Sequence, residues 1–268
     1  STTCHAVIIA KARAIPTVVG LGPLGENIDD GSRVILAGDT GEIVAEPTEA
    51  IIASYQEKIK KQQEMNAYYS SLVSLPAVTT DGVRVELMAN IGLPADVKAA
   101  IPYGCEGVGL FRSEFVFMGR QDVPTEDDQF ESYKEAVESC NGKLCVIRTM
   151  DIGGDKPLAY LNVPKEDNPF LGWRAVRISL QRRDLFMPQL KAILRAGVYG
   201  KAAIMVPMVI NVAEILKVKE FIEAAKVELA QEGKKYADDV QVGIMVETPA
   251  AAVMTPVLAK YVDFFSIG

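Results

Sequence analysis

The sequence comprises 268 residues, of which 49% are hydrophobic and 24% are charged, an ordinary composition for a soluble α/β protein. Its net charge of −7 argues against non-specific binding of nucleic acid. No apolar run is long enough to cross a bilayer and no secretory signal pattern is present, so we expect no membrane insertion. The four cysteines lack the paired spacing of zinc sites and disulfide frames, and we interpret them as reduced thiols of a cytoplasmic protein.

Residues 1–47 are predicted to be the C-terminal part of a small domain. A helix is expected from about Thr3, followed by a short strand at Thr17–Val19 and a hairpin of Ser32–Leu36 with Glu42–Ala45. A domain seldom starts on a helix cap with no strand before it. We therefore expect that the chain begins partway through a domain.

His5 is the single histidine of the sequence and falls in the first turn of that predicted helix. Free backbone N–H groups at a helix start favour an anion, such as a phosphoryl group carried on a ring nitrogen. The alternative is a histidine that fills a polar helix start, and the residue taken alone favours that alternative.

Residues 48–80 are predicted to form a linker helix between domains. Pro47 and Thr48 mark its start, and a polar, charged helix continues to about Leu72. Nothing in this segment indicates chemistry.

Residues 81–268 alternate between strand and helix patterns, which indicates parallel βαβ units. Six strands are predicted, at Val83–Ala89, Gly107–Leu110, Leu144–Arg148, Ala203–Pro207, Val242–Val246 and Val262–Ile267. A doubly wound sheet accommodates six strands. A (β/α)8 barrel truncated after about six strands fits better, because the chain stops directly after a strand with no covering helix.

Polar residues follow the predicted strands at the face where barrel enzymes build their active sites. Arg112 and Arg148 could clamp a phosphate or a carboxylate, because guanidinium groups match both anions with two hydrogen bonds. Glu247 could hold Mg²⁺, which prefers oxygen ligands and substrate phosphates. The other residues considered near this face are Asn90, Asp151, Lys156 and Arg174.

The stretch 146–156 has two interpretations. Arg148 and Asp151 could form a structural ion pair at the end of a buried strand. Alternatively Arg148 belongs to a phosphate clamp, with Gly153 and Gly154 letting the backbone approach a ligand. The combination with Arg112 and Glu247 favours the functional interpretation.

Five segments together resemble enzyme I of the bacterial phosphoenolpyruvate:sugar phosphotransferase system. They are GVGLFRSEF at 107–115, IRTMDIGGDK at 147–156, NPFLGWR at 168–174, GIMVETPA at 243–250 and FFSIG at 264–268. The resemblance covers nearly the whole chain, in order and with the spacing of the family.

This resemblance implies a phosphoenolpyruvate–protein phosphotransferase with a β/α barrel that binds phosphoenolpyruvate and Mg²⁺. It implies that His5 on a swivelling domain accepts the phosphoryl group and passes it to the carrier protein HPr. Arg112 and Arg148 match substrate-binding arginines, Glu247 matches a magnesium ligand, and Arg174 lies in a family motif. A homodimer through the barrel is also implied.

Several family features have no counterpart in this sequence, including the Asn-Asp pair after the sixth strand and a late cysteine proposed as proton donor. We therefore expect a central fragment that does not run the full reaction alone. Pyruvate phosphate dikinase or phosphoenolpyruvate synthase is one alternative, because Thr3-Cys4-His5 also occurs there, although those enzymes resemble the loop at 150–156 poorly. A non-catalytic regulatory module with the same fold is another.

Overall fold

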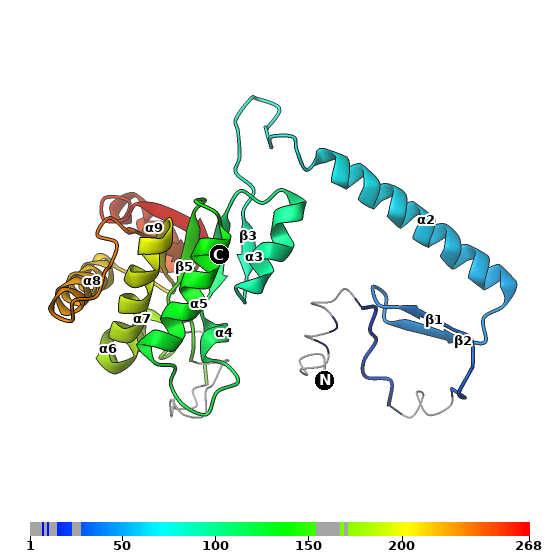
Figure 1. Ribbon diagram of the computed structural model, residues 1–268, viewed down its shortest axis with the longest axis horizontal. Coiled ribbons are helices and arrows are strands. Elements are labelled where there is room, and N and C mark those ends of the chain that lie inside the picture. The colour runs from blue at the N-terminus through cyan, green and yellow to red at the C-terminus, as the bar shows by residue number, and fades with distance from the viewer. Residues whose placement is uncertain (1–6, 8–9, 11–14, 23–27, 154–166, 169–170) are drawn as a thin grey trace. The chain divides into compact units, whose positions relative to one another are not determined.

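The computed structural model describes residues 7, 10, 15–22, 28–153, 167–168 and 171–268. The chain divides into two compact units, residues 1–72 and residues 73–268, and each is described separately (Figure 1). Much of the predicted helix around His5 lies outside the described residues, as does His5 itself.

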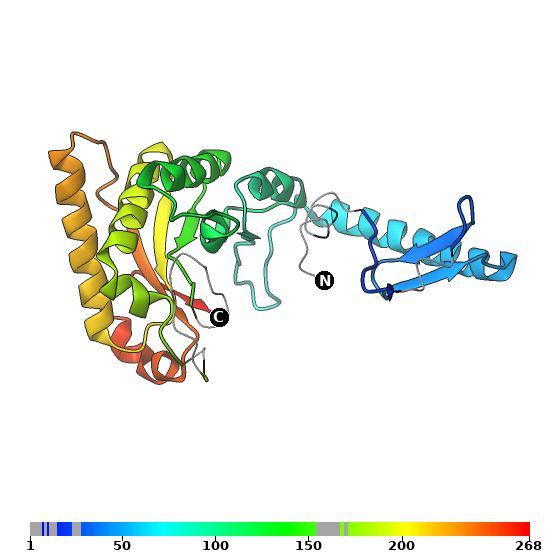
Figure 2. The same cartoon turned by 90° about the horizontal axis from the view of Figure 1, so that it is seen from below.

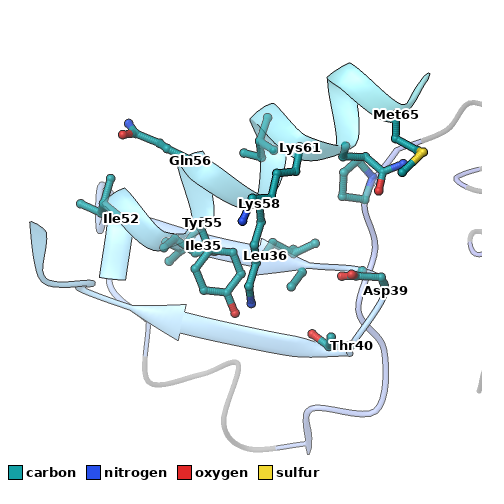
Figure 3. A pocket seen from close by; sticks show the side chains of 16 residues that line it. Ile35, Leu36, Asp39, Thr40, Ile52, Tyr55, Gln56, Lys58, Lys61 and Met65 are labelled. Atoms are coloured by element: carbon teal, nitrogen blue, oxygen red, sulfur yellow. The ribbon is translucent and has the colours of Figure 1, made fainter. Parts of the chain in front are cut away.

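The first unit contains the predicted hairpin and the predicted long helix. Strands β1 (Val34–Ala37) and β2 (Glu42–Ala45) pair antiparallel, and α2 spans Glu49–Leu72. An apolar groove of about 950 Å³ runs between the hairpin and α2. Figure 3 shows Tyr55 of α2 reaching across it, and the Tyr55 hydroxyl donates to Glu42 at 3.0 Å.

The prediction of a strand at Thr17–Val19 is wrong, because these residues pair with no strand among the described residues. The Thr17 hydroxyl instead donates to the Ile15 carbonyl, at 2.9 Å. The sequence pattern there contains β-branched residues but gives no information about a neighbouring strand, and a strand needs one.

The second unit is built on one parallel sheet of six strands. Their order is β3-β4-β5-β6-β7-β8, so every strand lies beside the next one in the chain. The strands are β3 (Ala89–Ile91), β4 (Val108–Arg112), β5 (Cys145–Arg148), β6 (Ala202–Val206), β7 (Gln241–Val246) and β8 (Phe264–Ile267). A doubly wound sheet would reverse its order partway. The prediction of a six-strand portion of a β/α barrel is confirmed.

The predicted strand at Val83–Ala89 is displaced, because the sheet strand is Ala89–Ile91. Residues 77–85 form a local ribbon instead, with the Val85 N–H donating to Ala77 at 2.8 Å and the Thr79 N–H donating to Val83 at 2.9 Å. Apolar and polar residues do alternate from Val83 to Leu87. This alternation belongs to the exposed ribbon and not to a strand of the main sheet.

Helices cover the outer side of the sheet, with α8 (Val212–Gln231) drawn in orange (Figure 2). The other helices of this unit are α3 (Ala95–Ala100), α4 (Glu114–Phe117), α5 (Glu126–Ser139), α6 (Val176–Gln181), α7 (Arg183–Ala196) and α9 (Pro249–Leu258). Among the described residues, no helix combines the length and the apolar character needed to cross a membrane.

Side-chain caps mark the starts of α5 and α8. Thr125 and Asp128 form a reciprocal capping box, in which each side chain accepts from the other's backbone N–H. Asn211 accepts from the Glu214 N–H at 3.0 Å at the start of α8. These caps fix where the helices begin and thereby the length of the loops above the sheet.

A charged network joins α5, α7 and the end of α8. Glu126 lies against Lys191 at 3.0 Å and Lys234 at 2.9 Å, and it also pairs with Arg195. Burial works to raise the pKa of Glu126, but hydrogen bonds from these cations outweigh burial and hold the pKa below its ordinary value. The Lys191 side chain is only 8% exposed, so its charge depends on the carboxylates.

We expect Glu126→Gln to lower the free energy of unfolding by about 2 kcal/mol at pH 7, because buried cations lose their shared partner. A depressed carboxyl pKa stabilises the fold above the unfolded-state value of about 4.3, and this contribution is lost as pH falls through the folded-state value. The difference in the free energy of unfolding between wild type and variant should therefore disappear at low pH. Denaturant titrations between pH 7 and pH 3 measure it.

Asp127→Asn is the matched control, since Asp127 contacts the same Arg195 at 2.7 Å with 76% of its side chain exposed. An exposed pair contributes less than about 1 kcal/mol. Equal losses of stability for the two variants, or a difference that persists at pH 3, would contradict this account of the network.

Candidate active site

The candidate active site lies at the carboxyl ends of β4, β5 and β7, which we call the rim. Arg112 ends β4 and Arg148 ends β5, and the two are directly paired in the parallel register. The strand ladder therefore places two guanidinium-bearing residues side by side. Glu247 follows the last residue of β7. This is the face of a barrel where active sites are built.

Arg148 is held by two carboxylates although it is only 6% exposed. Its guanidinium pairs with Glu114 at the start of α4 and lies 3.3 Å from the Asp151 carboxylate. It also approaches the sulfur of Met245 at 3.7 Å. Burying a guanidinium charge is costly unless carboxylates compensate it, so the position of this cation is fixed by its neighbours.

Asp151 links Arg148 to a second buried arginine, Arg174, which donates to Asp151 at 2.8 Å. A backbone bridge between Gly153 and Arg174 brings the two segments together. The Ala175 N–H donates to Ile152 at 3.0 Å beside this bridge. The loop after β5 is therefore closed against the segment before α6.

Gly153 makes this closure possible. Its φ is +117°, and a Cβ there would lie 2.7 Å from the Trp173 carbonyl and 2.8 Å from the Arg174 Cα. Only glycine accepts both the backbone conformation and the close approach. The glycine in the motif therefore has a packing role in addition to any role toward a ligand.

Arg112 differs from Arg148 and Arg174 in its partners. Among the described residues it forms no ion pair, and its guanidinium lies 4.8 Å from the centre of the Phe115 ring. Stacking on an aromatic face holds a guanidinium in place while leaving its edge donors available. Arg112 is therefore the arginine of the rim best suited to receive an anion.

Glu247 is held by strained backbone at the end of β6. Met208 has φ +61°, and its N–H donates to Glu247 Oε1 at 2.8 Å. Such a conformation in a non-glycine residue is often retained at functional sites. The adjacent Thr248 caps α9 and donates its hydroxyl to Val209 at 2.9 Å, which ties the end of β7 to the loop after β6.

The electrostatics around Glu247 favour a cation. Burial, followed by the charge of Asp151, raises the pKa of Glu247, while the Met208 N–H, Arg148 and Arg174 act in the opposite direction. A partly desolvated carboxylate near another carboxylate would gain from a bound Mg²⁺. Within the described part of the chain, however, no group of three or more His, Cys, Asp or Glu side chains gathers for a metal. Glu247 fits as one ligand of a set that the described residues do not complete.

The rim is nearly balanced in charge before any ligand binds. Its three guanidinium groups and three carboxylates are Arg112, Arg148, Arg174, Glu114, Asp151 and Glu247. A small organic phosphate with a carboxylate adds several negative charges. A divalent cation bound with it would restore the balance.

The structure brings most of the predicted residues together. Arg112, Arg148, Asp151, Arg174 and Glu247 lie at or beside the rim. Asn90 lies on β3 and is exposed. His5 and Lys156 lie outside the described residues.

Two residues at the site escaped the sequence analysis. Glu114 stands two positions after Arg112 in the same motif and begins α4, and an acidic residue so close to a predicted rim arginine was a signal that could have found it. Gln189 lies in the middle of α7, and no local pattern distinguishes it from other polar helix residues.

The fold and the site together define a barrel-type protein with an arginine-rich site at the carboxyl ends of its strands. A family model described as the PEP-binding domain of PEP-utilising enzymes matches residues 66–268, and one described as their mobile domain matches residues 1–41. The chain belongs to the PEP-utilising enzymes.

Similar curated proteins carry the name phosphoenolpyruvate-protein phosphotransferase. The chain is 48% identical to those of Priestia megaterium and Haemophilus influenzae and 46% identical to that of Staphylococcus aureus, in each case over 266 residues. The matches cover 99% of this chain and 46% of each relative, so the chain spans less than half the length of these relatives. The resemblance based on the motifs is confirmed.

We expect Gly153→Ala to destabilise the second unit by about 2 kcal/mol, since the Cβ adds a steric clash to an unfavourable φ. Gly142→Ala is the matched control, because Gly142 has φ +80° and open space around its Cβ position. Gly142→Ala should destabilise the unit by only about 1 kcal/mol, because it adds the unfavourable φ without a steric clash. Thermal unfolding of both variants measures the difference, and equal melting temperatures would refute the close packing at Gly153.

Proposed function

We propose that the rim binds phosphoenolpyruvate and that the protein transfers its phosphoryl group to His5. The observation that carries this proposal is the direct pairing of Arg112 with Arg148 on neighbouring strands. Glu247, directly after β7, lies close enough for the charge of Arg148 to act on its pKa. Membership of the PEP-utilising enzymes supports phosphoenolpyruvate as the anion. The phosphate and the carboxylate of this substrate are both anions that arginine recognises with two hydrogen bonds.

Each residue has a distinct role in this proposal. Arg112 receives a substrate anion with the donors at the edge of its guanidinium, and Arg148 adds fixed positive charge beside it. Glu247 holds Mg²⁺, which when bound neutralises charge on the transferring phosphate. Asp151 orients Arg148 and Arg174 through its two oxygens. Little covalent chemistry is left to the rim, because phosphoryl transfer depends mainly on positioning and charge.

The transfer balances as follows. A ring nitrogen of His5 attacks the phosphorus atom, the bond between phosphorus and the enol oxygen breaks, and the enolate of pyruvate leaves and takes up a proton. The new N–P bond keeps the phosphoryl group reactive toward a second acceptor. This requires His5 to move between loading and delivery, and we assign residues 1–47 to a swivelling phosphohistidine domain, 48–80 to a linker helix and 81–268 to the barrel.

The names of the relatives support a protein as the second acceptor. We propose that this acceptor is HPr, that the transfer is the first step of sugar uptake by the phosphotransferase system, and that the protein acts in the cytoplasm as a homodimer through its barrel. Three described cysteines, Cys105, Cys140 and Cys145, are free thiols, and this supports a reducing compartment.

Labelled phosphoenolpyruvate tests this proposal in the complete protein. We expect Mg²⁺-dependent incorporation of an acid-labile phosphoryl group into the wild type and none into the His5→Ala variant, because the nucleophile is removed. Labelling from ATP in place of phosphoenolpyruvate would instead identify a dikinase or synthase. Binding of phosphoenolpyruvate without any labelling would identify a non-catalytic module.

A further inference from the structure

Gln189 of α7 is a buried amide that makes three hydrogen bonds behind the rim. It is 1% exposed. Its Oε1 accepts from the Met150 backbone N–H at 2.9 Å, and its Nε2 donates to the Ser113 hydroxyl and to the Tyr133 hydroxyl, both at 3.1 Å. Both amide protons and the amide oxygen are thus engaged.

Two of these partners lie within the segments that carry the arginines. Met150 stands between Arg148 and Asp151 along the chain, and the Ser113 side chain comes from the residue between Arg112 and Glu114. Gln189 therefore joins the end of β4 to the end of β5.

The amide has one chemically sensible orientation. Rotating it by 180° would turn its NH₂ group toward the Met150 N–H and lose that bond. Tyr133 donates to Gln129 at 3.2 Å, and Gln129 donates to the Pro124 carbonyl at 3.2 Å. Burial raises the pKa of Tyr133, so its phenol keeps its proton and the chain of hydrogen bonds keeps its direction.

We propose that Gln189 is a positioning residue, which sets the spacing of Arg112 and Arg148 for a ligand that carries both a phosphate and a carboxylate. This inference rests on the proposed function. Gln189 acts through backbone and hydroxyl groups behind the arginines and does not touch the ligand. Groups that hold ligand-binding side chains in place commonly change affinity or activity by tenfold or more when they are removed.

Gln189→Met tests the proposal, because methionine has nearly the same length and shape but makes none of the three hydrogen bonds. Calorimetric titration with phosphoenolpyruvate and Mg²⁺ is made on the complete protein carrying His5→Ala, so that no transfer follows binding. In this background Gln189→Met should bind about tenfold more weakly than the protein with Gln189 intact. Steady-state kinetics should show the change in KM for phosphoenolpyruvate.

Glu126→Gln is the matched control, since Glu126 contacts Lys191 and Arg195 of the same helix α7. This control should lower the melting temperature and leave the affinity for phosphoenolpyruvate unchanged. A merely structural role for Gln189 would give the same pattern as the control.

A folded Gln189→Met variant with wild-type affinity would overturn the inference while leaving the proposed function intact. Failure of the wild type to bind phosphoenolpyruvate would overturn both. If Gln189→Met does not fold, Ser113→Ala replaces it as the test, because this change removes only the hydrogen bond between Gln189 and the β4 segment. A weaker affinity for phosphoenolpyruvate would then support the inference, and an unchanged affinity would overturn it.

Discussion

A charged guanidinium at the end of a buried strand is the constraint on which the site depends. Arg148 is nearly inaccessible to water, so it must be matched by the carboxylates of Glu114 and Asp151. Meeting that requirement places α4 over the end of β4 and folds the loop after β5 back toward Arg174. The same contacts thus stabilise the fold and assemble the site.

The structural ion pair and the phosphate clamp turn out to be compatible interpretations of the same residues. Arg148 and Asp151 do form an ion pair, as the simpler interpretation held. The pair leaves Arg112 as a neighbouring guanidinium that no described carboxylate neutralises. A fixed cation beside an available one is an arrangement that binds a doubly anionic ligand without much reorganisation.

The sequence predicted the barrel architecture because strand and helix patterns alternate over some 190 residues and local caps mark the helix starts. It also located Arg112, Arg148 and Glu247, since parallel strands bring their carboxyl ends to one face. It failed at Val83–Ala89, where alternation described an exposed ribbon. It could not find Gln189 or the strained Met208, because both depend on contacts between segments that lie 39 or more residues apart.

The affinity for phosphoenolpyruvate, measured by calorimetry with Mg²⁺, tests the central claim most directly. The measurement uses the complete protein carrying His5→Ala, so that no transfer follows binding, and compares Arg112→Met with intact Arg112. The account predicts that the variant folds and binds about a hundredfold more weakly, because a charge-assisted contact to the substrate is lost. Arg183→Met, which alters an exposed arginine paired with Glu228, should bind as the wild type does. An Arg112→Met variant with wild-type affinity would contradict the account.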